Sequence, residues 1–182
     1  LLITLHTILS HIGIVMKKYL LVVLVPLLII SCSKTSDKEY LDQAKKLLDE
    51  NKTTEAVTSL ETLVNEYPES ENAPQALVQL AQIYQNQLDK NIKPAESFEK
   101  AEKYFMQVYE KYPDSEEAPK ALFMSGFILA NDLQNYDKAT TSYNLFLEKY
   151  PSHPLAVSAK EELDNMGLTP EEILKRTETV QK

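Results

Sequence analysis

One short block of sequence occurs three times in this chain, and it constrains the fold more than any other feature. Each copy has a Tyr-Pro pair, a short polar turn and a second proline close to an alanine, and the copies begin at Tyr67, Tyr112 and Tyr150. A proline ends a helix because it has no amide hydrogen to donate, and a Ser or Asp just after it can cap the next helix. Such a chain is expected to stack copies of one helical unit side by side.

The residues before each Tyr-Pro pair keep a fixed register. A small residue lies twelve positions before the proline, and large apolar residues lie eight and five positions before it. These sets are Ala56, Leu60 and Leu63, then Ala101, Phe105 and Val108, then Ala139, Tyr143 and Phe146. Sets with the same spacing precede them, namely Tyr40, Ala44 and Leu47, then Leu77, Ala81 and Tyr84, then Leu122, Gly126 and Leu129. Spacings of four and three place each set on one helix face, so each unit is a helix pair.

This register resembles the tetratricopeptide repeat (TPR), whose period is about 34 residues. We therefore expect an all-α fold, a right-handed α-solenoid of helix-turn-helix TPR repeats. The predicted repeats cover residues 38–68, 72–113 and 117–151, followed by a capping helix at 153–166 within a domain of residues 38–168, and by a C-terminal helix and tail at 169–182. The second repeat is longer than the third, and we place its extra residues in the turn at 87–93.

The apolar segment before Cys32 predicts export. Residues 16–31 are typical of a signal peptide, with a basic start and an apolar stretch too short to span a bilayer as a helix. This segment ends in Ile-Ile-Ser-Cys, which resembles the lipobox of bacterial lipoproteins, in which the cysteine thiol is acylated and the leader is removed. We expect a lipid on Cys32 and a flexible tether at 32–37.

Residues 1–15 are expected to be an untranslated or upstream extension, because they lie ahead of a Met-Lys-Lys start. The alternative is a membrane hairpin made of the two apolar segments on either side of Lys17 and Lys18. That hairpin is the weaker hypothesis, because each apolar segment is short for a helix that spans a bilayer and the turn between them is charged.

The charge and the reactive residues exclude several classes of function. All 27 Asp and Glu follow Cys32, together with 17 of the 19 Lys and Arg, so nucleic acid is an unfavourable partner. One histidine, His153, follows Cys32, without a second cysteine or a glycine-rich loop. This composition offers no metal cluster, no Cys/His or Ser/His nucleophile and no phosphate cradle. We expect no catalytic residue, no metal, no cofactor and no enzymatic activity.

Over residues 40–163 the sequence resembles the envelope branch of the tetratricopeptide family. The resemblance depends on the Tyr-Pro-acid-Ser turns, on residues 118–122 with Gly126, and on residues 136–139. The chain is similar to the BamD-like outer-membrane assembly lipoproteins and to the C-terminal repeats of the Tol–Pal coordinator protein (CpoB/YbgF). The first group carries a lipid, as Cys32 predicts, but has more repeats. The second matches the repeats more closely, but has an N-terminal coiled coil and ordinarily no lipid.

The resemblance implies an outer-membrane-anchored lipoprotein that faces the periplasm. Its function would be that of a protein–protein interaction scaffold in envelope biogenesis, of the β-barrel outer-membrane protein assembly type. One alternative is a Tol–Pal-linked coordinator of cell-wall synthesis and division. An alternative from another class is a periplasmic protein that binds a small molecule or glycan. The expected partners are other envelope proteins or peptide segments, and the membrane through the N-terminal lipid.

In this repeat type the first helices line a concave groove, and residues one position off the packing register are expected to face it. These candidates are Lys45, Gln82, Gln85, Lys120, Phe123 and Phe127. Phe123 and Phe127 are neighbours on one helix face and would suit an extended segment or a helix of a partner. In the alternative, the two rings are part of the core, packed on Leu155 and Ala159 or covered by Ile173 and Leu174.

Overall fold

The computed structural model describes residues 34–180, with side chains as far as Arg176. The described residues from Ser36 onward belong to one compact unit, Ser36–Lys182. The predicted leader and the predicted lipid site at Cys32 lie outside the described residues. Among the helices of residues 34–180, none has both the length and the apolar character needed to cross a membrane.

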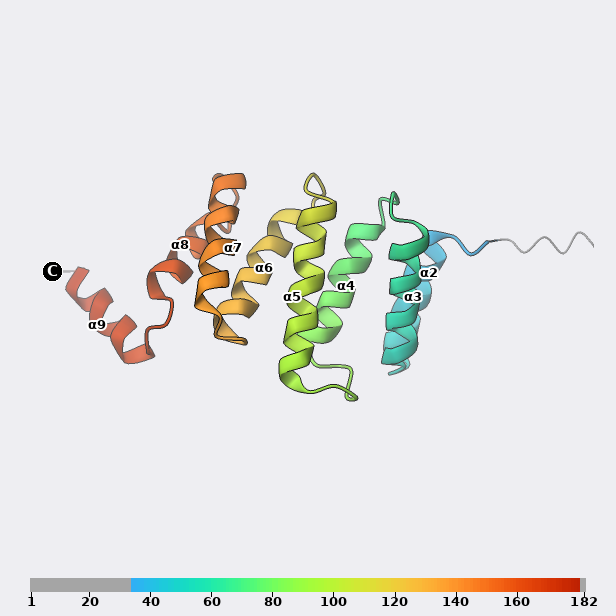
Figure 1. The fold of residues 1–182 in the computed structure, drawn as a ribbon, viewed down its shortest axis with the longest axis horizontal. Helices are drawn as coiled ribbons and strands as arrows, with labels where there is room; N and C mark the ends of the chain where they lie inside the picture. Colours follow the sequence, from blue (N-terminus) through green and yellow to red (C-terminus); the bar gives the residue numbers. More distant parts are fainter. Residues whose placement is uncertain (1–33, 181–182) are drawn as a thin grey trace, which may run out of the picture. The chain divides into compact units, whose positions relative to one another are not determined.

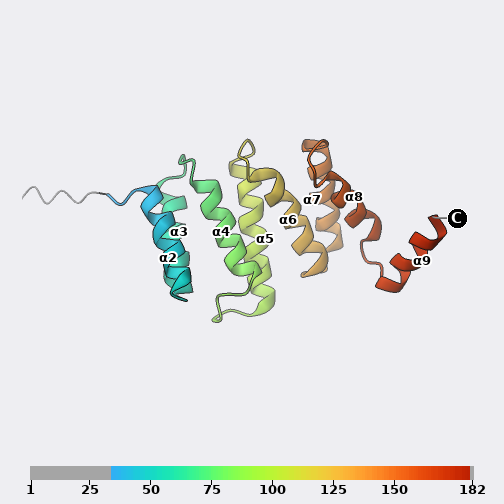
Figure 2. The same ribbon diagram turned by 180° about the vertical axis from the view of Figure 1, so that it is seen from behind.

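The described residues of the unit Ser36–Lys182 form eight α-helices and no strand, which confirms the predicted all-α fold. The helices are α2 (Asp37–Asp49), α3 (Thr53–Glu66), α4 (Ala73–Gln85), α5 (Pro94–Lys111), α6 (Ala118–Asn131), α7 (Tyr136–Lys149), α8 (Ala156–Asn165) and α9 (Pro170–Val180). Figure 1 and the reverse view in Figure 2 show α2 to α8 side by side in chain order. This arrangement is that of a helical-repeat solenoid.

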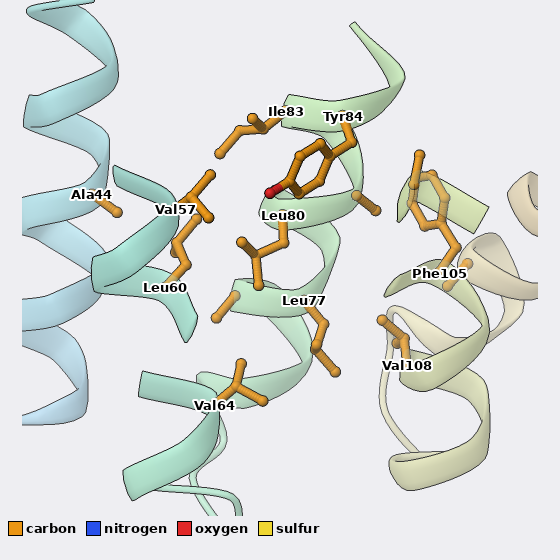
Figure 3. Packing of buried hydrophobic residues seen from close by; sticks show 14 of the residues in the cluster. Ala44, Val57, Leu60, Val64, Leu77, Leu80, Ile83, Tyr84, Phe105 and Val108 are labelled. Carbon is orange, nitrogen blue, oxygen red and sulfur yellow. The ribbon is translucent and has the colours of Figure 1, made fainter. Parts of the chain in front are cut away.

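The predicted packing residues form the interior of this row. Each helix from α2 to α7 packs against the next, and α7 packs against α8. Ala56, Ala101 and Ala139 are all 0 % exposed, so small side chains let the paired helices approach closely. Figure 3 shows side chains of α3 and α4 that point toward each other, with Leu60 opposite Leu80. Each fully buried leucine of this kind contributes about 1.5–3 kcal/mol relative to an exposed one.

The extra residues of the second repeat are divided between a connection and a helix, and not confined to the turn at 87–93. The connection between α4 and α5 covers residues 86–93, whereas the one between α6 and α7 covers only residues 132–135. In addition, α5 has 18 residues, against 14 in both α3 and α7. Pro94 begins the added turn of α5, a position where the missing amide hydrogen of proline leaves no helical hydrogen bond unmade.

The tyrosines of the Tyr-Pro turns link neighbouring repeats. The Tyr112 hydroxyl donates to the Pro68 carbonyl at 2.8 Å, and the Tyr150 hydroxyl donates to the Pro113 carbonyl at 3.2 Å. Each tyrosine therefore reaches back one repeat to the equivalent turn. This contact explains why the turn carries tyrosine and not merely a large apolar residue, because the ring packs while its hydroxyl satisfies a backbone acceptor.

The start of the array is held by polar contacts around α2. The Ser36 hydroxyl accepts from the Glu39 amide, and the Glu39 carboxylate accepts from the Ser36 amide at 2.8 Å, which forms a capping box. The Asp37 carboxylate accepts from Ser70 and, at 2.9 Å, from the Asn72 side chain. These hydrogen bonds hold the pKa of Asp37 below its usual range. These hydrogen bonds connect α2 to the turn before α4.

Gly126 lets a side chain of the partner helix α7 pack directly against the backbone of α6. A Cβ atom at this position would lie 3.0–3.2 Å from three ring carbons of Tyr143 on α7. The Tyr143 side chain is itself 0 % exposed, and its hydroxyl has no hydrogen-bond partner within the described residues. Burial also raises the pKa of this hydroxyl. The ring therefore fits tightly, while the hydroxyl at its end is unsatisfied.

Replacing Tyr143 with phenylalanine should therefore raise the free energy of unfolding by about 1 kcal/mol, because it removes a buried hydroxyl that lacks a partner. Urea denaturation of the purified protein measures the change. The matched control is Tyr112→Phe, which removes a hydroxyl that donates to Pro68 and should lower the same free energy. If Tyr143→Phe destabilises the protein as much as its control does, the hydroxyl has a partner in solution.

Helix α8 occupies the place of a first helix in a fourth repeat, but it carries different residues on one face. Nine and thirteen residues after the repeat proline, the second and third repeats have the buried pairs Leu77 with Ala81 and Leu122 with Gly126. The corresponding residues of α8 are Lys160 and Asp164, and both are exposed. The face that would receive another second helix is therefore charged. On the adjoining side of the helix, Ala156 and Ala159 are buried.

Candidate binding groove

The first helices of the repeats border two open furrows that share a helix. The larger furrow lies between α4 and α6 and has a volume of about 730 Å³. The smaller one lies between α2 and α4 and has a volume of about 460 Å³. Gln75, Gln79 and Gln82 of α4 line both furrows. The glutamine face of α4 is therefore a ridge with a furrow on either side.

The α4–α6 furrow combines amide side chains with an apolar floor. Four glutamines of α4 line it along almost the full length of that helix, namely Gln75, Gln79, Gln82 and Gln85. Its apolar lining residues are Val78, Phe105, Ala121 and Met124. Phe105 belongs to the core and is only 3 % exposed, so the furrow reaches down to the hydrophobic interior. Such a surface offers both hydrogen-bonding groups and apolar area to a ligand.

The charge of the furrow differs from that of the rest of the chain. Helix α4 contains no charged residue, and Lys120 is the only one in α6. The other charged residues that line the furrow, Glu116 and Glu117, lie in the turn before α6. The second helix α5, by contrast, contains seven charged residues among its 18. In a chain with a formal net charge of −8, the furrow is thus close to neutral, with its few charges at one end.

Four of the six predicted groove residues line one or other of the two furrows. Gln82, Gln85 and Lys120 line the α4–α6 furrow. Lys45 lines the α2–α4 furrow, where Gln82 is also present. The register prediction missed Gln79, which lies four residues after Gln75 and three before Gln82 and so belongs to the same helix face. It also missed Met124, because α6 has apolar residues on several sides.

The other two predicted groove residues do not line either furrow. Phe123 is only 8 % exposed, and its ring contacts Tyr143 and Phe146 at centroid distances of 5.5 and 5.8 Å. Phe127 is half-buried against the same cluster. Phe123 is therefore a core residue, which corrects the groove position expected from its register. The rings it meets belong to α7, and Leu174 of α9, which the alternative placed over Phe123, is 64 % exposed.

A third hollow, of about 570 Å³, lies where α6, α8 and α9 end or begin. Its lining is mainly polar and includes Asn131, Glu161 and Glu162. In the part of the chain that the structure describes, no three His, Cys, Asp or Glu residues gather in a way that could hold a metal ion. The furrows along α4, by contrast, combine amide side chains with apolar lining residues.

Comparison with protein families gives one match that covers most of the described fold. The model of the family YfiO, described as an outer membrane lipoprotein, matches residues 33–167. The match begins directly after Cys32 and ends after α8, so it includes both furrows. It supports the resemblance to BamD-like lipoproteins and gives no support to the resemblance to the Tol–Pal coordinator. The comparison with curated proteins gives no match.

Proposed function

Because this chain belongs to the YfiO family of outer membrane lipoproteins, we propose that its repeats form a protein-interaction scaffold for the assembly of outer-membrane proteins. A lipid on Cys32 would hold the scaffold at the outer membrane, with the repeats in the periplasm. The partners would be other envelope proteins, or segments of them. The scaffold would act through binding alone, without catalysis.

The observation that carries this proposal is the α4–α6 furrow itself. It lies on the first helices of two successive repeats, it reaches the apolar core at Phe105, and it is lined by polar groups that can still bond to a partner. Such mixed surfaces are typical of protein interfaces, whose apolar centre excludes water while polar groups fix the orientation.

Site-specific photo-crosslinking in living cells tests the proposal. A photoreactive residue in place of Gln82 should crosslink to one or a few envelope proteins, because this side chain lines both furrows. The matched control places the same residue at Lys103, an exposed position on the second helix α5. It should give at least tenfold less of the same products. The variant Cys32→Ala, in a second arm, should leave the outer-membrane fraction.

The identity of the crosslinked proteins also decides between the assembly role and the division-linked role. Components of the β-barrel assembly machinery at Gln82 would support the assembly role, whereas Tol–Pal components there would replace it with division-linked coordination. Equal crosslinking from Gln82 and Lys103 would refute the furrow as the binding surface. The earlier aromatic candidate Phe123 is unsuitable for this test, because its substitution would disturb the core and not only the surface.

A further inference from the structure

We propose that Asn51, in the turn between α2 and α3, is the acceptor of an N-linked oligosaccharide supplied by a polyprenyl-diphosphate-linked donor. The sequence of residues 49–53 is Asp-Glu-Asn-Lys-Thr. It contains an Asn-X-Ser/Thr sequence without proline in the middle, which is the acceptor sequence for N-glycosylation of exported proteins. The inference goes beyond the scaffold function and shares with it only the export of the chain.

The acceptor sequence occurs at one place in the chain. Of the nine asparagines, Asn51 alone is followed two positions later by Ser or Thr. Such a sequence can accept a glycan only where the asparagine lies on the surface, because a glycan is bulky and hydrophilic. The structure of the turn therefore decides whether Asn51 can be modified.

The side-chain amide of Asn51 is available to a transferase. The residue is exposed, and no hydrogen bond within the described residues uses its side chain. The Asn86 amide, by comparison, donates to the Gln82 carbonyl at 2.8 Å. The Asn91 amide donates to the Asp89 carboxylate at 3.0 Å. The asparagines of the α4–α5 connection are thus occupied, whereas the nitrogen of Asn51 is not.

The turn keeps its shape without the help of this side chain. The Asn51 amide of the backbone donates to the Leu48 carbonyl at 2.9 Å, and the Lys52 amide donates to the Leu47 carbonyl at 2.8 Å. Asn51 has a φ of 58°, in the left-handed region, which asparagine tolerates better than most residues. Backbone hydrogen bonds therefore close the turn, and the side chain remains free for another role.

Two neighbouring side chains offer recognition groups. Thr53 begins α3, and no hydrogen bond within the described residues uses its hydroxyl, the group that Ser and Thr share at this place of the acceptor sequence. Asp49 ends α2, is exposed, and forms no ion pair in the part of the chain that the structure describes. Its carboxylate lies two positions before Asn51 and can bind a basic group of a transferase. We expect both side chains to be recognised.

The transfer is a substitution at the anomeric carbon of the first sugar. The amide nitrogen of Asn51 forms a bond to this carbon, and the bond between the carbon and the phosphate oxygen breaks. The polyprenyl diphosphate leaves with the electron pair of that bond, and the nitrogen loses one proton to a base of the transferase. The protein supplies only the acceptor, so the reaction requires no catalytic residue in this chain.

The position of the turn leaves the larger furrow accessible. Figure 1 shows the α2–α3 turn at the same edge of the row as the long α4–α5 connection. Asp49 lines the end of the α2–α4 furrow, but no residue of the turn lines the α4–α6 furrow. A glycan on Asn51 would therefore lie beside the smaller furrow and would not occupy the larger one.

Mass spectrometry of the full-length protein, purified from the envelope of its source cells, tests the inference. Proteolytic peptides that contain Asn51 should carry an oligosaccharide, and fragmentation should leave its first sugar on the Asn51 nitrogen. Thr53→Ser should keep the glycan, whereas Thr53→Val, which has the same size without the hydroxyl, should lose it. Asp49→Asn should lower the glycosylated fraction at least tenfold, because the charge of the recognition group is lost.

Asn51→Gln is the matched variant for the acceptor itself. Gln87 and Gln134 have φ values of 52° and 51° in the corresponding turns, so glutamine fits the backbone of this position. The variant should therefore fold like the native protein, which circular dichroism and thermal unfolding check. It should carry no glycan, because its amide lies one methylene farther from the backbone.

Unmodified Asn51 in protein from the outer-membrane fraction would overturn the inference and leave the scaffold function standing. A glycan that persists in Asn51→Gln would be attached elsewhere and would overturn it too. A single sugar on Asn51 would indicate a nucleotide-sugar donor and refute the proposed one, and an unchanged glycosylated fraction in Asp49→Asn or Thr53→Val would refute the role of that residue. Absence of the protein from the envelope would refute export, and with it both proposals.

Discussion

Replacing Phe146 with alanine should lower the free energy of unfolding by about 3–5 kcal/mol, the range observed for truncating a buried aromatic side chain. Phe146 is 0 % exposed and is the centre of the aromatic cluster in the last complete repeat. Its ring lies 5.8 Å from that of Phe123, 5.7 Å from Tyr150 and 5.7 Å from His153. Alanine would leave a cavity among side chains that come from three successive segments, α6, α7 and the turn before α8. Urea denaturation measures the loss.

The loss of stability in Phe146→Ala should also differ between the helices of the array. The buried residues form two clusters, one mainly in α2 to α5 and one in α6 to α8, and Phe146 belongs to the second. In repeat proteins, stability is approximately a sum of local terms and nearest-neighbour interfaces. Amide hydrogen exchange of Phe146→Ala should therefore quicken in α6 to α8 far more than in α2 and α3. The control Val157→Ala, at a side chain that is 66 % exposed, should change stability by less than about 0.5 kcal/mol. Uniform loss of protection in all helices would contradict the two-cluster description.

Replacing Gly126 with leucine should lower the free energy of unfolding by about 3 kcal/mol, at the upper end of the usual cost of overpacking. Leucine is a better helix former than glycine, by up to about 1 kcal/mol, so the substitution would stabilise an exposed helix. Here the first added atom already lies 3.0 Å from the Tyr143 ring, and that ring is fully buried and cannot turn away. The cost of overpacking against Tyr143 therefore outweighs the gain in helix propensity.

A double-mutant cycle checks this explanation. In the background of Tyr143→Ala, the ring that opposes position 126 is absent, so Gly126→Leu should cost much less, or even restore stability by filling the cavity. Chemical denaturation of the four proteins gives the coupling energy. If the two substitutions are simply additive, the destabilisation by leucine has a cause other than contact with Tyr143.

The sequence was sufficient to predict the helix pairs because their apolar positions keep strict spacings. The alanines at 56, 101 and 139 and the large residues that follow them are all buried as the register requires. The extra residues before α5 were harder to assign, since Pro94 is compatible with a loop and equally with the first turn of a helix. Local sequence could not decide between the two because the difference depends on packing against α4 and α6.

The candidate groove was predictable on α4 and less so on α6 for a physical reason. On α4, glutamines occupy one side and apolar residues the other, so periodicity shows which face is free. The sequence of α6 is apolar on nearly all sides, since it packs between α5 and α7 and also contacts the last aromatic cluster. Periodicity alone therefore could not separate Phe123, which is buried, from Met124, which lines the furrow.

The charged face of α8 has a consequence for the behaviour of the protein at high local concentration. A solenoid whose last helix exposed an apolar face could add another molecule end to end, and an open contact of this kind grows into filaments. Lys160 and Asp164 stand at the two positions where such a contact would need Leu and a small residue. Any molecule that stacked there would bury the charge of Lys160 together with the ion pair that Asp164 forms with Arg176 at 3.8 Å, and so would remove charged groups from water. Crowded in the plane of a membrane, these proteins would therefore stay separate at this end.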